Sequence, residues 1–263
     1  MNKRRVVITG LGVLAPNGNS LTQYWNALIS GKSGIGPIKG FDAENLSVKI
    51  AGELSDFNPE DHFNRKEVGK LDPFSIYALV TAQEAISQAG LNNGDVNKER
   101  IGVIIGTGVG GIQTLESQHS VLLSRGQRRV TPYFVPKFIA NIAAGQIAIH
   151  HGFQGTNHTV ISACASGTDA IGTAARTIQY GDADVVITGG TEASVTPLTI
   201  SGFANMRALS TRNDDPAGAS RPFDLDRDGF VLGEGAASLI LEDAEHAKAR
   251  GATILAELAG YGA

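Results

Sequence analysis

Short, continuous runs of valine and isoleucine recur along the chain, and they restrict its fold more than any other feature. They end in glycine or other small residues and cover residues 6–11, 101–105, 159–161, 185–188 and 238–241. Runs that are apolar at every position, rather than at alternate positions, are typical of strands buried on both faces of a mostly parallel sheet. The sequence therefore predicts a central sheet that is covered on both sides.

Helical patterns separate these runs. An apolar stripe along residues 76–86 follows Pro73, and a cleaner stripe along residues 166–180 ends before Gly181. Residues 242–250 place their acidic side chains before their basic ones, which is the charge order that a helix dipole favours. Strands that alternate with helices in this way indicate a layered α/β fold.

Composition and charge exclude several classes of protein. Hydrophobic residues make up 42% of the 263 residues, charged residues make up 18%, and the net charge is −4. These values are ordinary for a globular chain, and the negative charge argues against binding driven by nucleic-acid phosphates. No run reaches the 18 or so apolar residues of a membrane span, and glycines interrupt the apolar start at residues 6–14. We therefore expect a soluble, cytoplasmic protein.

The chain has one cysteine, Cys164, which excludes an internal disulfide and suits a reducing compartment. It lies between a predicted strand that ends at Ser162 and a predicted helix that begins at Ser166, with small residues on either side. A helix N-terminus lowers the pKa of a thiol and raises its thiolate fraction, which acyl transfer requires. A buried structural cysteine is the alternative. The local pattern makes Cys164 a candidate nucleophile.

Seven stretches along the chain resemble sequence motifs of the β-ketoacyl-acyl carrier protein synthases, especially the type II elongation enzymes, and they occur in the same order. They cover residues 5–14, 105–111, 131–136, 162–167, 180–184, 208–213 and 220–224 continuing through 228–235. The resemblance implies a thiolase-like layered fold, a mostly parallel sheet flanked by helices, and normally a homodimer. It implies that Cys164 accepts an acyl chain, which then condenses with malonyl-carrier protein after loss of carbon dioxide, in fatty acid or polyketide chain elongation. No dissociable cofactor is implied.

The resemblance also implies roles for six other residues. Three match positions that line the substrate and acyl cavities: Val109, Phe134 and Phe203. Three match positions at which the acidic acyl carrier protein docks: Lys66, Lys70 and Arg207. Ordinary solvated charge is the alternative for these basic residues. Gly69 stands where many relatives carry another basic residue, which weakens the docking interpretation.

One departure from the family pattern is large. The second half of the family's chain supplies two histidines, one from a His-Gly-Thr motif and one from a Gly-His motif. Neither motif occurs in these 263 residues. We therefore expect residues 1–252 to form the half that bears the nucleophile. Residues 253–263, with a strand-like run at 254–258, would begin a C-terminal half that is largely missing. Condensation by this chain alone is not expected.

Other functions remain open at this point. Gly106, Gly108 and Gly111 match a dinucleotide fingerprint, as in an oxidoreductase, but no acidic residue follows about twenty positions later. A non-catalytic partner subunit, like the chain-length factors, usually lacks the nucleophile, and a thiolase acting on coenzyme A thioesters shares the fold. The six histidines lack metal-binding spacing. The aspartate-rich motif at residues 224–229 opens like a calcium-binding loop, but the twelfth position of such a loop, which requires a glutamate, is occupied by Gly235. No metal is therefore expected.

Overall fold

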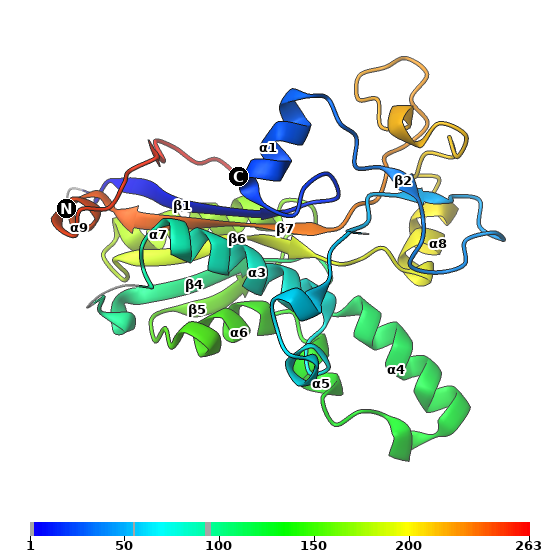
Figure 1. Cartoon of the computed structure of the whole chain (residues 1–263), viewed down its shortest axis with the longest axis horizontal. Coiled ribbons are helices and arrows are strands. Elements are labelled where there is room, and N and C mark those ends of the chain that lie inside the picture. Colours follow the sequence, from blue (N-terminus) through cyan, green and yellow to red (C-terminus); the bar gives the residue numbers. More distant parts are fainter. Residues whose placement is uncertain (1–2, 55, 93–95) are drawn as a thin grey trace.

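A computed structural model describes residues 3–54, 56–92 and 96–263. Its centre is a six-stranded sheet in the order β5-β4-β6-β7-β1-β8 (Figure 1). The strands are β1 (Val6–Leu14), β4 (Ile101–Gly106), β5 (Asn157–Val160), β6 (Val185–Glu192), β7 (Gly235–Asp243) and β8 (Ala256–Glu257). Four of the five valine and isoleucine runs lie within these strands, and the run at residues 159–161 overlaps only the end of β5, since Ile161 lies outside that strand. The predicted central sheet is therefore confirmed.

The strand directions are mixed. β4 pairs in parallel with β5 and with β6, whereas β7 runs antiparallel to both β6 and β1. β8 runs antiparallel to β1 at the edge. Since β7 is reversed against both of its neighbours, β1 points the same way as β4, β5 and β6. Four of the six strands therefore share one direction, and the carboxyl ends of β4, β5 and β6 meet at one side of the sheet.

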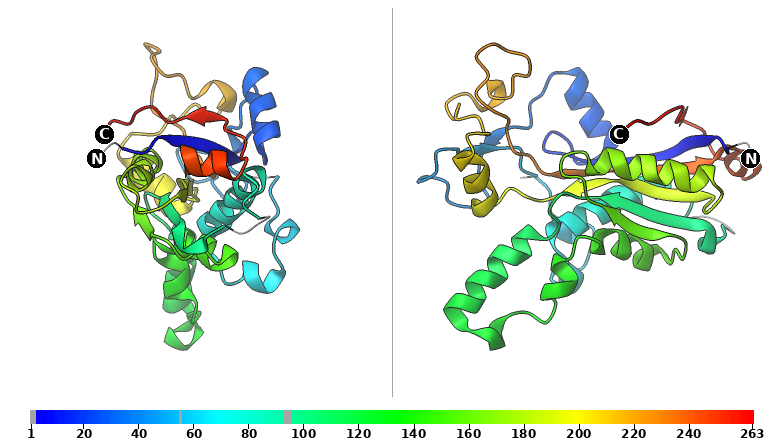
Figure 2. Two further views of the ribbon diagram at one scale, coloured as in Figure 1. Left: turned by 90° about the vertical axis from the view of Figure 1, so that its left-hand side faces the viewer. Right: turned by 180° about the vertical axis from the view of Figure 1, so that it is seen from behind.

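Helices cover both faces of the sheet. α3 (Pro73–Gln88) and α6 (Ile142–His151) pack on one face, and α7 (Ser166–Gln179) packs on the other (Figure 2). Successive residues of β4 alternate between the two cores: Ile105 packs with α3 and α6, and Ile104 packs with α7. Both side chains are buried, which explains why the strand is apolar at every position.

Two glycines of β1 allow α3 to approach the sheet closely. A Cβ atom on Gly10 would lie 2.1 Å from the carbonyl oxygen of Ala85, and one on Gly12 would lie 2.0 Å from that of Thr81. No side chain fits such a gap. The glycines that break the apolar run at residues 6–14 are therefore required by the packing of α3.

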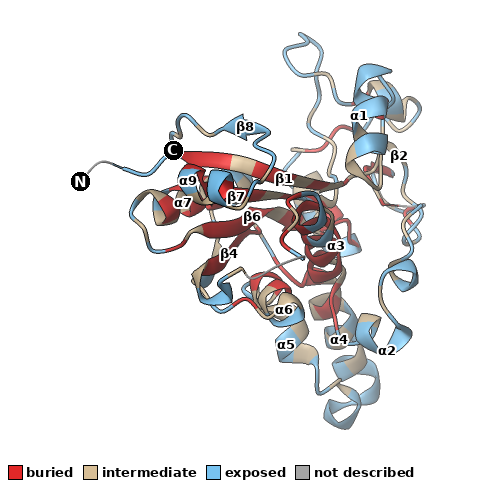
Figure 3. Cartoon of the chain, turned by 60° about the vertical axis from the view of Figure 1, so that its left-hand side comes forward, coloured by how far each residue is buried: buried red, intermediate tan, exposed pale blue. Residues whose placement is uncertain are grey.

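The other elements surround this core. They are α1 (Leu21–Ile29), β2 (Gly36–Pro37), β3 (Ile50–Ala51), α2 (Arg65–Val68), α4 (Ile112–Arg125), α5 (Phe134–Phe138), α8 (Pro197–Asn205) and α9 (Ala244–Ala249). α4 projects away from the sheet and is largely exposed, as is α1, whereas the central strands are buried (Figure 3). No helix within the described residues combines the length and apolar character needed to cross a membrane.

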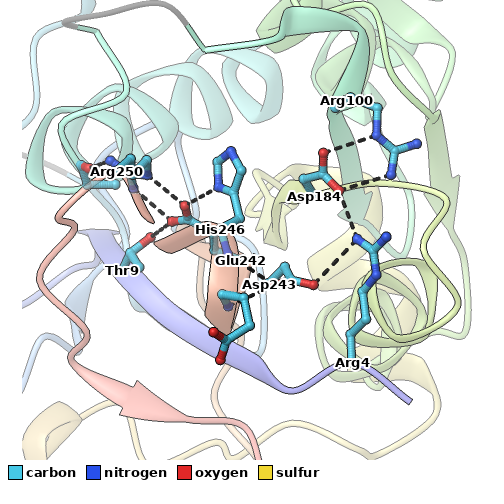
Figure 4. A network of polar contacts seen from close by, with 10 residues as sticks. Arg4, Thr9, Arg100, Asp184, Glu242, Asp243, His246 and Arg250 are labelled. Carbon is cyan, nitrogen blue, oxygen red and sulfur yellow. Dashed lines mark hydrogen bonds and ion pairs between the residues drawn. The ribbon is translucent and has the colours of Figure 1, made fainter. Parts of the chain in front are cut away.

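The predicted helix at residues 242–250 begins two residues too early. Glu242 and Asp243 end strand β7, and α9 begins at Ala244. The Asp243 side chain caps α9 by accepting from the amide N–H groups of Glu245 and His246. Glu242 is fully buried and its carboxylate binds Arg250, so an acid that reads as a helix start belongs to the core (Figure 4).

Candidate active site

Cys164 lies on a tight turn between β5 and α7, and its side chain is exposed. The preceding residue, Ala163, has a φ of 52°, which is rare for a residue with a side chain. The Ser166 hydroxyl braces this turn: it donates to the Ala163 carbonyl oxygen at 2.6 Å and accepts from the Ser162 amide at 2.9 Å. The turn therefore holds the thiol beside the amino end of α7.

Glycines let this turn approach the ends of the parallel strands. A Cβ atom on Gly106, at the end of β4, would lie 2.2 Å from the carbonyl oxygen of Ser166. On Gly167 it would lie 3.5 Å from the Cα atom of Gly190 in β6. The thiol consequently lies where the carboxyl ends of β4 and β6 meet, the usual place for ligand sites in sheets of this kind.

A cavity of about 650 Å³ adjoins Cys164. Val109 and Phe203, two of the three predicted cavity residues, line it together with Phe230, whose ring packs edge-on against Phe203 at 5.4 Å. Phe134 is not among the lining residues; its ring stacks on Phe138 within α5, with the ring centres 5.6 Å apart. The structure therefore brings Cys164, Val109 and Phe203 together and leaves Phe134 elsewhere.

Glu192, at the end of β6, is a cavity residue that the sequence reasoning missed. Its carboxylate accepts hydrogen bonds from the amides of Gly108, Val109 and Gly110 at 2.6, 3.2 and 3.3 Å. These are the N–H groups of the glycine-rich turn, which a nucleotide phosphate would need. Since the protein's own carboxylate occupies them, the geometry does not support the dinucleotide interpretation. The sequence feature that could have indicated this contact is an acidic residue at the end of a predicted strand, here β6, which pairs with β4.

A second acidic group, Asp169, lies in the first turn of α7. It accepts hydrogen bonds from the hydroxyls of Ser162 and Tyr261, the latter at 2.6 Å. The bond from Ser162 and then the bond from Tyr261 hold the pKa of Asp169 below its usual value. The Tyr261 ring packs directly over Gly172, where a Cβ atom would lie 2.3 Å from a ring carbon. No local sequence pattern signals this contact, because Tyr261 is 92 residues from Asp169.

The three predicted docking residues are all exposed. Lys66 lies on α2, Lys70 lies 5.8 Å from the centre of the Tyr133 ring, and Arg207 follows α8 with a φ of 56°. In the part of the chain that the structure describes, none of the three forms an ion pair with an acidic side chain. Their side chains are free to meet an acidic partner.

The histidines lie away from the cavity. None of the six is among its lining residues, and the described residues hold no group of three side chains arranged for a metal. The ring of His246 lies 2.6 Å from the buried carboxylate of Glu242. The aspartate-rich motif at residues 224–229 forms contacts with neighbouring residues of the same loop, among them an ion pair between Asp228 and Arg221 at 3.3 Å.

The layered α/β sheet, with a cysteine on a strand-to-helix turn, has the arrangement of the thiolase-like fold class. Residues 3–247 match the family model described as the β-ketoacyl synthase N-terminal domain. The chain belongs to this family, which confirms the predicted resemblance and fold.

Curated relatives support the same assignment. The chain is 50% identical to the 3-oxoacyl-[acyl-carrier-protein] synthase 2 of Synechocystis sp. over 99% of its own length and 63% of that relative's length. It is 49% identical to the synthase of the same name from Coxiella burnetii, over 100% of this chain and 63% of the relative. The chain thus spans about 63% of the length of these relatives.

Solved structures share the fold. A β-ketoacyl synthase from Burkholderia phymatum superimposes with a TM-score of 0.87 at 34% identity, over 97% of this chain and 62% of that one. The ishigamide ketosynthase/chain length factor superimposes with a TM-score of 0.90 at 32% identity, over 99% of this chain and 63% of that one. The predicted division at residue 253 stays a prediction.

Proposed function

We propose that this chain carries the acyl-accepting half of a β-ketoacyl-acyl carrier protein synthase of fatty acid chain elongation. Cys164 accepts the acyl group from a carrier-bound thioester, and malonyl-carrier protein then loses carbon dioxide and condenses with the acyl-cysteine. The observation that carries the proposal is the position of Cys164, exposed at the amino end of α7 and beside a cavity that holds Val109 and Phe203.

The local geometry suits acyl transfer. The sulfur can reach a thioester because the turn projects it outward, and the helix dipole of α7 favours negative charge beside it. Backbone N–H groups at a helix start are suitable donors for the oxyanion that forms when the thiolate attacks a carbonyl carbon. Ser166 holds both the sulfur and these N–H groups in place, since its hydroxyl braces the turn and the residue is itself the first of α7.

The test is a mass measurement after incubation with an acyl-loaded carrier protein. An adduct of the acyl mass on the peptide containing Cys164 is expected, and Cys164→Ser abolishes it because a hydroxyl lacks the nucleophilicity of a thiolate. Ser162→Ala, two positions away, is the matched control and keeps the adduct. An acyl group found on another residue, or on the Cys164→Ser chain, contradicts the proposal.

The partner in this proposal is acyl carrier protein. One structural neighbour is a type II polyketide ketosynthase solved in complex with its acyl-carrier protein; it is 34% identical to this chain, with a TM-score of 0.83. We assign docking of the acidic carrier to Lys66, Lys70 and Arg207, which are exposed and carry no acidic partner among the described residues.

Charge reversal tests this docking surface. Changing all three residues to glutamate slows association with the carrier protein, and raising salt slows the wild type in the same way. Reversal of three other exposed lysines, Lys3, Lys98 and Lys248, is the matched control. These lie at the opposite end of the sheet, where β1 and β4 begin, and leave association unchanged. Equal association rates for the two triple variants at low salt mean that the surface is ordinary solvated charge.

We also propose that the complete enzyme acts as a homodimer in the cytoplasm. β5 is an edge strand of the sheet, and Ile161 beside it is 61% exposed. An uncovered edge with an apolar residue is a suitable surface for pairing with a second copy. Light scattering after size-exclusion chromatography measures the mass; a monomer at micromolar concentration in the full-length enzyme contradicts this part.

The second candidate is a non-catalytic partner subunit. The similarity to a ketosynthase/chain length factor structure brings this function into consideration. The exposed Cys164 favours the catalytic role, because a subunit that only shapes the product has no use for a reactive thiol at this turn. The adduct measurement above distinguishes the two.

A further inference from the structure

Glu192 holds the middle of the loop that links β4 to α4. The ends of this loop are fixed by backbone bonds: the Thr107 amide donates to the Val160 carbonyl oxygen, and the Gly111 amide donates to that of Phe138. The three amides between them all point to Glu192. One carboxylate oxygen accepts from Gly108 and Val109 at 2.6 and 3.2 Å, and the other accepts from Gly110 at 3.3 Å.

Thr107 completes the arrangement. Its hydroxyl donates to Glu192 at 3.0 Å and accepts from the Gly110 amide at 3.1 Å, so its side chain closes the ring of donors around the carboxylate. A concave group of successive N–H groups is ordinarily a site for an external anion. Here the anion is part of the chain, which indicates that the group serves to position the loop rather than to bind a ligand.

The loop lies against the turn that carries Cys164. A Cβ atom on Gly108 would be 2.9 Å from the Glu192 carboxylate and 3.6 Å from the carbonyl oxygen of Ala163, the residue before Cys164. The side chain of Val109 is 47% exposed and lines the cavity beside the thiol. Since the Val109 amide is bonded to Glu192, this carboxylate determines where the isopropyl group stands in the cavity wall.

We propose that Glu192 is a positioning residue for chain selection. By fixing the loop, it holds Val109 in the wall of the Cys164 cavity and so determines how readily long apolar chains reach the sulfur. The inference rests on the proposed function for its biological meaning, because the apolar chain is then the acyl group. Its test uses probes that alkylate any accessible thiol and therefore does not require acyl transfer.

The probes are iodoacetamide and N-dodecyl iodoacetamide, and the measured quantity is the ratio of their second-order rates at Cys164. Glu192→Gln keeps the size of the side chain but replaces one accepting oxygen with an NH₂ group that cannot accept. We expect the ratio of long-probe to short-probe rates to change about tenfold, the order of effect that loss of a hydrogen bond to a charged group produces. A ratio within about twofold of the wild type overturns the inference.

Hydrogen exchange gives a second readout. In the wild type the amides of Gly108, Val109 and Gly110 are protected, and in Glu192→Gln their exchange accelerates about tenfold while that of β4 stays unchanged. Equal protection of the loop in both chains overturns the inference. Glu245→Gln is the matched control, since Glu245 lies exposed on α9 and its carboxylate bonds only the Lys248 side chain among the described residues.

A double-mutant cycle tests whether the effect passes through Val109. Val109→Ala removes the isopropyl group and no hydrogen bond, so it folds even if Glu192→Gln does not, and it alone must change the probe ratio. In the double variant, Glu192→Gln adds little further change if both substitutions act on the same contact. Fully additive effects, or an unchanged ratio in Val109→Ala, overturn the inference. Failure of the acyl adduct at Cys164, by contrast, concerns only the proposed function.

Discussion

The Ser166 hydroxyl donates a hydrogen bond of 2.6 Å to the carbonyl oxygen of Ala163, whose backbone has a positive φ of 52°. The same hydroxyl accepts from the Ser162 amide, so one buried side chain stabilises an unfavourable backbone conformation next to Cys164. The turn that carries Cys164 is therefore held by a side chain of the helix that follows it.

Removing this brace changes the reactivity of the thiol. Ser166→Ala loses two hydrogen bonds of about 1 kcal/mol each, so we expect Cys164 to be alkylated by iodoacetamide about fivefold more slowly. We expect chemical denaturation of this variant to show a loss of stability of about 1–2 kcal/mol. Ser124→Ala is the control: that hydroxyl bonds the Ser120 carbonyl oxygen on an exposed face of α4, and its loss leaves the alkylation rate unchanged. Equal rates in all three chains contradict the role of Ser166.

The Glu242 network supports the opposite end of the sheet. The Glu242 carboxylate is fully buried and binds Arg250 through two bonds of 2.6 and 2.7 Å, together with Thr9 and His246 (Figure 4). Arg250→Ala leaves a buried charge without its main partner, so we expect the free energy of unfolding to fall by about 3–5 kcal/mol. Lys248→Ala removes an exposed pair with Glu245 and costs less than about 1 kcal/mol. Similar losses in the two variants contradict this reading.

The contrast between these two regions shows what the sequence could predict. The turn that carries Cys164 is local: a strand, a small-residue turn and a helix follow one another within residues 157–179, so the pattern alone predicts the position of Cys164 in the fold. The Glu242 network is not local, since Thr9 lies 233 residues from Glu242. An acid ahead of a helix reads as a dipole-favoured start, and only the packing of β1 against β7 reveals that its carboxylate is buried.

The cavity shows the same division. Val109 and Phe203 both line the cavity, because Val109 follows β4 and Phe203 lies on α8, which follows β6. Their contact with a substrate stays a prediction. The sequence did not predict the role of Glu192, because its partners, residues 107–110, lie about 80 residues earlier in the chain. Only the pairing of β4 with β6 brings them beside its carboxylate. Phe134 is on α5, to which the chain returns after the projecting α4, and its ring stacks on Phe138; nothing in the local sequence around Phe134 indicates this contact.

The lowered pKa of His151 predicts that the folded protein loses stability in mild acid. Burial, and then the nearby His150 and Lys98, lower the pKa of His151 to about 4, against about 6.5 in an unfolded chain. Below pH 6.5 the unfolded state takes up a proton that the native state refuses until about pH 4, so stability is complete above the higher value and falls between the two. Allowing for partial exposure, we expect a loss of about 2 kcal/mol.

Denaturation curves between pH 7.5 and 4 check this dependence. His151→Phe fills the same space beside Phe153 with a ring that does not titrate, and the slope between about pH 6.5 and 4 then becomes shallower. His119→Gln, at an exposed position of α4, keeps the wild-type slope. A His151→Phe chain with an unchanged slope assigns the pH dependence to other groups.

The last prediction concerns condensation by residues 1–263 alone. Loss of carbon dioxide from a malonyl group develops an enolate charge, which needs preorganised donors, and removing one such donor costs about two to three orders of magnitude in rate. None of the six histidines lines the Cys164 cavity among the described residues, and the family's two histidine motifs do not occur in the chain. We therefore expect Cys164 to be alkylated, yet malonyl-carrier protein to be decarboxylated at least about a thousandfold more slowly than by a full-length relative. Adding, in cis or in trans, the remaining portion of a relative's chain restores the reaction only if it supplies those donors, so variants of its two histidines are the control. Turnover by the 263 residues near that of the relative contradicts the prediction and means that this cavity already contains a complete set of donors.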